Sequence, residues 1–216
     1  MSWRENTHAL KTHPRRKNIT QEELGGVVGW FNGAVASSGL NNGAGGVIRI
    51  NEIFSYKWFL NCGLGTNTRV EVLGSWVLLT LENRLSLKTI HIMGDFKIII
   101  DWLLGKGQLQ VLSLDCWEDS ITGLITTFQN ISFDHVYKEE NQDPDSLSKL
   151  ALTREPGKLT YFQCIKEHEG PHLSLDLFYF LVFFNIVVKA LCGLIYFLLG
   201  YLVLHFCGTA HPLSLH

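Results

Sequence analysis

Short apolar runs separated by glycine-rich turns open the ordered part of the chain. Residues 27–31 read VVGWF, residues 44–50 read AGGVIRI and residues 53–62 read IFSYKWFLNC. Runs of this length and composition predict three β-strands, and the polar SSGLNNG at 37–43 predicts the turn between the first two. Three consecutive strands with short turns form an antiparallel meander.

After the third strand the spacing of apolar residues changes to that of an α-helix. Between residues 68 and 84 they recur at helical spacing, at Val70, Leu73, Val77 and Leu81, which predicts a long helix. Residues 87–94, LKTIHIMG, then predict a fourth strand, and residues 95–107, DFKIIIDWLLGKG, predict a helix closed by Gly105.

Three more elements complete the pattern. LDCWEDSITGLITTF at 114–128 has one apolar helical face, and ISFDHVYKE at 131–139 alternates as a fifth strand. A short helix follows at 143–152, with Pro144 in a tolerated first-turn position. The order βββ-α-β-α-α-β-α predicts an α/β fold, a mixed five-stranded sheet with flanking helices.

The two ends of the chain differ from this domain, which we place at residues 25–158. Residues 1–24 are polar and predict a linker or disordered arm, with a basic cluster at 15–17 that is typical of a solvated linker or of a nuclear-localisation signal. Residues 159–176 are expected to be a linker. Residues 177–207 are expected to form an apolar helix.

That apolar helix admits three interpretations. The stretch from Ile186 to Phe206 has 21 residues, long enough to cross a bilayer, and Lys189 could snorkel to the interface. A C-terminal membrane anchor, a helix packed on the domain or a partner, and a translated stretch without selected function all stay open. The localisation is therefore nucleus or cytoplasm for the domain, and membrane if the helix inserts.

The net charge and the cysteine content limit which partners and which redox compartment the sequence favours. The 216 residues carry a formal net charge of -2, so contact with nucleic acid would need a local basic patch rather than a global field. The cysteines show no CxxC pair and no metal-ligand spacing, which favours free thiols in a reducing compartment; they are Cys62, Cys116, Cys164, Cys192 and Cys207.

Acidic residues fall where strands end and helices begin. Glu71 lies in the first turn of the predicted helix 68–84, Asp95 follows the fourth strand, and Asp145 begins the last helix, while Asn32 ends the first strand. In a sheet of the predicted order these positions converge, and clustered carboxylates suit Mg²⁺. Taken singly, each acid is more typical of a solvated first-turn residue or a cap.

Four ordered blocks resemble one family. FNGA…GAGGVI is similar to FDGA…GAGGVI, TNTRVEV to TNTRAEL, MGDFKIIIDW to GDSKVVIDW, and HVYKEENQDPDSLSKLAL to HVYREANREADRLSKEAL. Over roughly residues 27–155 the chain resembles the plant RNase H-like domain derived from non-LTR retrotransposons, also called the reverse transcriptase-associated RNase H family.

The resemblance implies an active site. The family's metal-binding carboxylates fall on Asn32, Glu71, Asp95 and Asp145, with Glu71, Asp95 and Asp145 also catalytic, and they imply two Mg²⁺ ions, with Mn²⁺ as a substitute. Asn32 departs from the pattern, because a neutral amide offers a carbonyl oxygen without the charge. Hydrolysis is therefore expected to be weakened by several orders of magnitude.

Other departures are smaller. The loop after the fifth strand, YKEENQD, lacks the histidine of many RNases H, and His135 inside the strand is interpreted as a structural or surface residue rather than as that catalytic group. Phe96 replaces a small capping residue, and Pro144 replaces a small residue beside Asp145. Neither Asp101 nor Asp143 is placed by the sequence in the role of Asn32.

The resemblance also implies partners. The loop 37–43, which alone is more typical of a plain hairpin turn, and the segment Thr66–Arg69 would contact phosphates and sugars of an RNA/DNA hybrid. The expected function is hydrolysis of the RNA strand by a monomer; the alternative is an inactive nucleic-acid-binding or membrane-tethered interaction protein. The residues expected to contact nucleic acid are Gly33, Ser37, Ser38, Asn41, Asn67, Thr68 and Asn141.

Overall fold

The computed structural model of the chain describes residues 26–38, 41–109, 114–166 and 168–177. Both the expected N-terminal arm, residues 1–24, and the apolar stretch from residue 178 onward, including 186–206, lie outside the described residues. Within the described ranges no helix is both long and apolar enough to cross a membrane.

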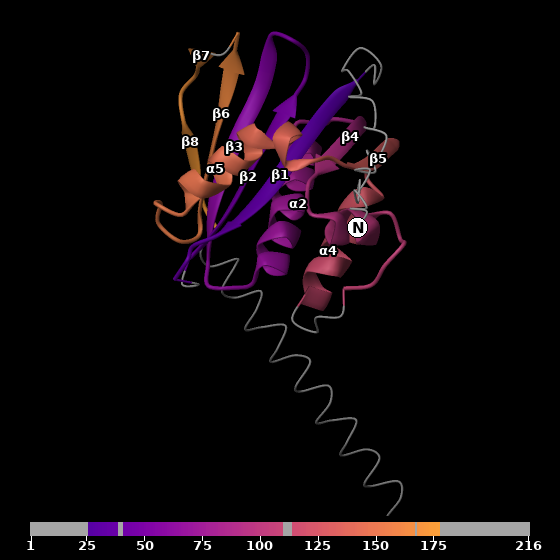
Figure 1. The fold of residues 1–216 in the computed structure, drawn as a ribbon. Helices are drawn as coiled ribbons and strands as arrows, with labels where there is room; N and C mark the ends of the chain where they lie inside the picture. The colour runs from indigo at the N-terminus through magenta and orange to yellow at the C-terminus, as the bar shows by residue number, and fades with distance from the viewer. Residues whose placement is uncertain (1–25, 39–40, 110–113, 167, 178–216) are drawn as a thin grey trace, which may run out of the picture.

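One twisted mixed sheet organises the fold (Figure 1). Its strands follow the order β5-β4-β1-β2-β3-β6-β7, and β8 also pairs with β6. The meander β1–β2–β3 is antiparallel as predicted, while β4 runs parallel to both β1 and β5. The strands are β1 (Val27–Val35), β2 (Asn42–Arg49), β3 (Phe54–Gly63), β4 (Thr89–Gly94), β5 (Asn130–His135), β6 (Lys158–Ile165), β7 (His168–Glu169) and β8 (Leu173–Asp176).

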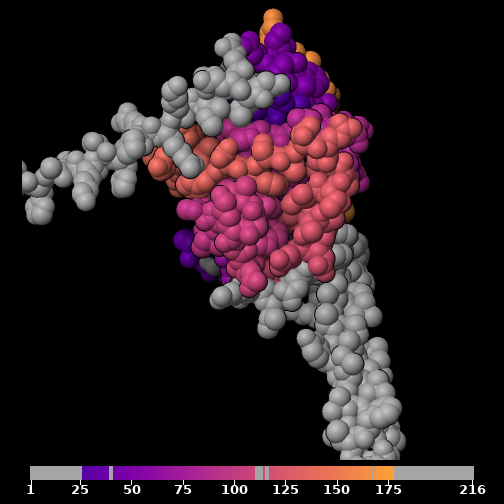
Figure 2. Space-filling view, turned by 90° about the vertical axis from the view of Figure 1, so that its right-hand side faces the viewer, coloured from indigo at the N-terminus to yellow at the C-terminus, as the bar shows by residue number. Residues whose placement is uncertain are grey.

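Helices cover both faces of the sheet. On one face, helix α2 (Asn67–Arg84) packs on β1 and β2, and α4 (Asp115–Ile125) packs against α2. On the other face, α5 (Gln142–Ala151) crosses β1, β2 and β3. Side chains alternate between the faces of a strand, so successive residues of β2 meet different helices. The short α3 (Lys97–Leu103) follows β4. Together with α4 and β5 it forms much of the surface that faces the viewer in Figure 2.

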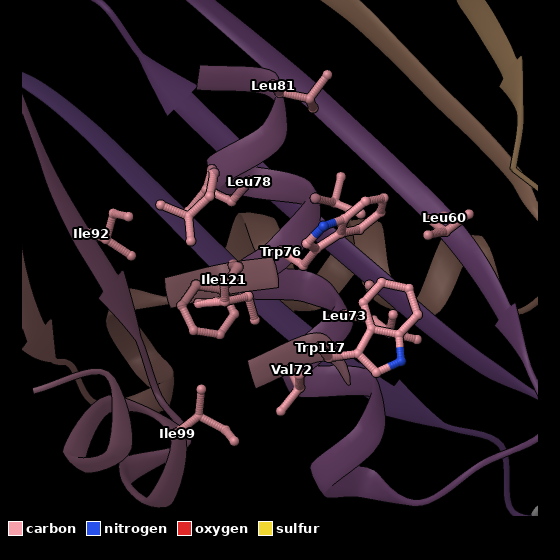
Figure 3. Close-up of a cluster of buried hydrophobic side chains, with 14 of the residues drawn as sticks. Leu60, Val72, Leu73, Trp76, Leu78, Leu81, Ile92, Ile99, Trp117 and Ile121 are labelled. Carbon is pink, nitrogen blue, oxygen red and sulfur yellow. The ribbon is translucent and has the colours of Figure 1, made fainter. Parts of the chain in front are cut away.

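The larger core lies between the sheet and α2 (Figure 3). Trp117 of α4 is fully buried, and its ring meets that of Trp76 edge-on, with the centroids 5.1 Å apart and the planes at 72°. The indole N–H of Trp76 donates to Ser120 Oγ at 3.2 Å, which satisfies its polar atom. Burial of such a side chain contributes roughly 1.5–3 kcal/mol, so this pair fixes α4 on α2.

Two glycines let α5 lie directly on the strand backbone. A Cβ at Gly43 would lie 2.2 Å from Ser148 O, and one at Gly45 would lie 2.4 Å from Ser148 N. Real Cβ atoms essentially never approach backbone atoms so closely, so any side chain at either position would push α5 outward. The GAGG run of the sequence therefore sets the height of α5 above the sheet.

Beyond the predicted last helix the sheet continues. Residues 159–176, expected to be a linker, instead form most of β6 and all of β7 and β8, so the linker prediction is wrong. The described residues form an eight-stranded sheet where five strands were predicted. Phe162 and Cys164 are buried on the α5 face of the sheet, together with Leu147 and Ala151, whereas Leu159 belongs to the larger core on the α2 side. The edge of β3 needs a hydrogen-bonding partner, which β6 supplies from Phe54↔Ile165 to Leu60↔Leu159.

Candidate active site

Asn32 lies where β1 passes the end of β4. The parallel pairing of the two strands stops at Phe31↔Gly94, and Asp95 follows directly. The sequence predicted that Asn32 ends the first strand. In the structure Asn32 still pairs with Gly45 of β2, so it lies inside β1. The residue is 4% exposed. This step between two neighbouring strands brings Asn32 and the loop containing Asp95 to one edge of the parallel pair.

Helix α2 supplies Glu71. Thr66 caps the helix by accepting from Arg69 N at 3.2 Å, which places Glu71 one turn inside rather than in the first turn. A Cβ at Gly33 would lie 2.6 Å from Val70 Cγ1 and 3.0 Å from Glu71 Cδ, so the glycine permits the approach of α2. Glu71 is consequently buried, and its Oε2 has no hydrogen-bond partner among the described residues.

Helix α5 supplies Asp145 from its first turn. Oδ1 of Asp145 accepts from Asn32 Nδ2 at 3.3 Å, and Oδ2 lies 2.5 Å from Lys149 Nζ. Lys138 Nζ lies 3.9 Å from Oδ1. The amide of Asn32 also donates to Ser148 Oγ at 3.2 Å. Asn32 is therefore a hydrogen-bond donor toward Asp145, in a place where a carboxylate would repel it.

Electrostatic interactions between neighbouring acids shift the pKa values of Glu71 and Asp95. Burial, and next the charge of Asp95, raise the pKa of Glu71 from its ordinary 4.5 to about 8, against a smaller lowering by the Gly33 backbone amide. Burial also raises the pKa of Asp95, aided by the charge of Asp145 and opposed by Asn141 and Lys138. Negative charge at this edge of the sheet is thus incompletely neutralised by the protein.

Two residues position the acidic loop and α5. Asn141, fully buried before α5, donates from Nδ2 to Phe31 O at 2.9 Å and so ties the start of the helix to β1. His135 of β5 donates from Nε2 to Asp95 O at 3.0 Å. The histidine thus holds the backbone that carries Asp95, which is a structural role of the kind predicted for it.

Glu71 and Asp95 are the acids of this site that could hold a divalent cation. Within the described ranges no group of three His, Cys, Asp or Glu side chains lies close enough to hold a metal ion. Glu71 and Asp95 nevertheless repel each other, and Glu71 has an unpartnered buried oxygen. Mg²⁺ is commonly held by one or two carboxylates, waters and substrate phosphates, which this pair would suit. Both oxygens of Asp145 already accept from Asn32 or Lys149.

The residues expected to contact nucleic acid divide into two groups. Ser37 and Ser38 are exposed in the turn that joins β1 to β2, and Asn67 is exposed at the start of α2. The others have structural contacts: Asn41 Nδ2 donates to Leu152 O at 2.8 Å, and Gly33 and Asn141 pack as described above. Thr68 lies in the first turn of α2.

The contacts of Ser148 and Lys149 with Asp145 were not predicted from the sequence. Ser148 is fully buried and its Oγ donates to Asp145 O at 2.8 Å, while Lys149 pairs with the carboxylate. Both lie in the matched block DPDSLSKLAL, three and four residues after Asp145, on the same face of a helix. This helical spacing is the feature of the sequence from which both contacts could have been predicted.

Comparisons with known proteins agree on the fold. A family model described as reverse transcriptase-like matches residues 31–151, more than half of the chain. RNase H1 from Halobacterium salinarum NRC-1 is 22% identical with a TM-score of 0.53, over 58% of this chain and 96% of that one. No curated protein sequence matches the chain.

Two further solved structures give the same result. The N-terminal RNase H domain of a Mycobacterium tuberculosis protein is 20% identical, with a TM-score of 0.53 over 58% of this chain and 92% of that one. LC11-RNase H1 in complex with an RNA/DNA hybrid is 16% identical, with a TM-score of 0.54 over 58% of this chain and 96% of that one. At these identities the likeness shows a shared fold.

Proposed function

Because the chain belongs to the reverse transcriptase-like family, we propose that it binds RNA/DNA hybrids and hydrolyses the RNA strand, in a form weakened by Asn32. One observation carries the proposal. The charge of Asp95 raises the pKa of Glu71, the charge of Asp145 raises that of Asp95, and Asp145 accepts a hydrogen bond from Asn32. The three acids come from elements far apart in sequence, and the pKa values of Glu71 and Asp95 are raised, which is typical of a functional site.

The roles of the residues follow from their contacts. Glu71 and Asp95 would hold a divalent cation, which when bound supplies an activated water and charge stabilisation for phosphodiester hydrolysis. Asn141 and His135 keep the two backbones that carry the acids in place. Asp145 would face the substrate with Lys149 beside it, because its side chain is partly exposed.

The amide of Asn32 is the reason to expect weak hydrolysis. A carboxylate at this position would add one negative charge between Asp145 and the loop containing Asp95. Asn32 instead donates a hydrogen bond to Asp145, which stabilises the site without any cation. Metal-ion electrostatics contribute several kcal/mol to such a transition state, so a loss of about 4 kcal/mol would slow hydrolysis roughly a thousandfold.

The substrate class rests on the family and on the exposed polar loops. LC11-RNase H1, which shares the fold, is in complex with an RNA/DNA hybrid in its solved structure. In the present chain Ser37, Ser38 and Asn67 offer small polar groups suited to phosphates and sugars. The four matched sequence blocks further support an origin in a non-LTR retrotransposon of a plant.

The decisive experiment restores the missing charge. The full chain and its Asn32→Asp variant are assayed on a labelled RNA/DNA hybrid in Mg²⁺ and in Mn²⁺, with Asn32→Ala as the control for loss of the amide. We expect Asn32→Asp to hydrolyse the RNA strand at least ~100-fold faster. In a metal-chelating buffer the same variant should melt at a lower temperature than the wild type, because the new carboxylate would face Asp145, and Mg²⁺ should reverse that difference.

Two results would change the conclusion. Cleavage by neither protein in either metal, with hybrid binding retained, would identify an inactive nucleic-acid-binding protein. If Asn32→Asp gained activity that persisted when Glu71 was also changed to Gln, the cleavage would come from a contaminant or from another site.

A further inference from the structure

A polar pocket lies at the far end of α5, away from the acids. It has a volume of about 440 Å³ and opens on the face of the sheet that α5 crosses. Strands β6 and β8 form one wall, and both lie outside the residues that the family model matches. Its lining includes Phe59, Arg154, Lys158, Thr160, His172 and Ser174.

Arg154 is a cation in the lining of this pocket. Its backbone carbonyl accepts from Asn61 Nδ2 at 2.6 Å, and its guanidinium carbon lies 5.6 Å from the centre of the Phe59 ring. No carboxylate within the described part of the chain forms an ion pair with it, so its N–H groups are available to an anion. A guanidinium over the face of an aromatic ring is held there by cation–π attraction, and its planar fork of N–H groups suits bidentate binding of phosphate.

The rest of the pocket adds donors and little buried negative charge. Thr160 Oγ1 and Ser174 Oγ lie 3.4 Å apart on adjacent strands. The ring of His172 stacks on Phe162 with centroids 4.2 Å apart. Lys158 pairs with Glu155 at 3.6 Å, but the Glu155 side chain is 82% exposed, so water screens this pair and an incoming anion can displace it.

The position of the pocket connects it to the acids. Helix α5 rises about 1.5 Å per residue, so the stretch from Asp145 to Ala151 spans about 9 Å, and Arg154 lies about one further turn of chain away. A strand laid along α5 would therefore reach Arg154 roughly three to four nucleotides from Asp145, at about 3.4 Å per nucleotide. Lys149 is exposed on the same helix between them.

We propose that this pocket binds a phosphate group, and that its source is the backbone of a nucleic-acid strand whose reacting region lies at Asp145. The proposal rests on the proposed function. It assigns to β6 and β8 a second phosphate contact, which lengthens the footprint of the domain on a hybrid.

The test uses the full chain and fluorescence anisotropy with an RNA/DNA hybrid over a series of salt concentrations. Removal of one phosphate contact should reduce the slope of log affinity against log salt by roughly 0.9. Arg154→Ala should show that reduction, whereas Arg154→Lys should keep the slope because it keeps the charge. Lys106→Ala, an exposed change just after α3, is the matched control and should leave the slope unaltered.

Thermal melts of each variant show whether the uncovered Phe59 has altered folding, and a variant that melts like the wild type is required for the comparison. If the wild type binds the hybrid and Arg154→Ala leaves the slope unchanged, the pocket proposal fails while the proposed function stands. If the wild type binds no hybrid, the proposed function fails. Binding of adenosine monophosphate that depends on Arg154, without any effect on the hybrid, would overturn the strand as the source of phosphate.

Discussion

Replacement of Glu71 by Gln should change how the stability of the domain depends on pH. Glu71 is 3% exposed, one of its carboxylate oxygens has no partner among the described residues, and its pKa is raised to about 8 from an ordinary 4.5. The folded state therefore holds a proton that the unfolded state releases between those values. In that window the free energy of unfolding falls as pH rises, and the full stability is present only below the lower value.

The magnitude follows from proton linkage. One additional proton in the folded state corresponds to about 1.4 kcal/mol per pH unit, so Glu71 should remove roughly 2.7 kcal/mol between about pH 5 and about pH 7. Gln has a similar shape and does not titrate. The Glu71→Gln curve should therefore lie progressively above that of the wild type as pH rises, while contributions of other titrating groups cancel in the comparison.

Urea unfolding of the metal-free full chain, followed by tryptophan fluorescence at several pH values, measures this difference. Trp76 and Trp117 are buried in the core between α2 and α4 and report its loss. Glu52→Gln, an exposed change, is the control and should run parallel to the wild type. Parallel curves for Glu71→Gln and the wild type would refute the burial argument, because a solvated Glu71 would titrate alike in both states.

Two further predictions concern the scaffold. Glu82 of α2 is fully buried with both carboxylate oxygens unpartnered among the described residues and its pKa raised by burial, so Glu82→Leu should increase the free energy of unfolding at pH 8 by at least ~1 kcal/mol in the same urea assay. A chain ending at Gly157 should lose cooperative unfolding, whereas one ending at Leu177 should keep it, because Leu159, Phe162 and the pairing of β3 with β6 complete the core; near-ultraviolet circular dichroism with urea distinguishes the two.

Strong local patterns made the order of elements predictable through α5. The apolar spacing of α2 and the short runs of β1 to β4 each agree with the structure because local preference and burial coincide there. Strand β6 was missed since KLTYFQCI alternates imperfectly and leads into EHEGPHLSLD, whose charged and turn residues are typical of a linker. Its strand identity depends on the open edge of β3, a tertiary fact that the local sequence does not contain.

The neighbours of Asn32 could be predicted, but their contacts could not. The matched blocks point to Glu71, Asp95 and Asp145, and these lie around Asn32 because the topology fixes where β1 passes the end of β4. The direction of the Asn32 amide was not predictable: it was expected to offer an oxygen to a cation, and it points its N–H group at Asp145. Side-chain orientation at such a position is decided by neighbours from three elements.

The contact of Gly43 and Gly45 with the backbone of Ser148 has an evolutionary consequence. Because glycine and main-chain atoms determine where α5 rests, the frame around position 32 does not depend on whether an amide or an acid stands there. Codons for asparagine and aspartate differ by a single base. A lineage carrying this chain would thus keep the architecture of the site through a period without selection, and a single substitution at position 32 would return the charge to a frame that is still in place.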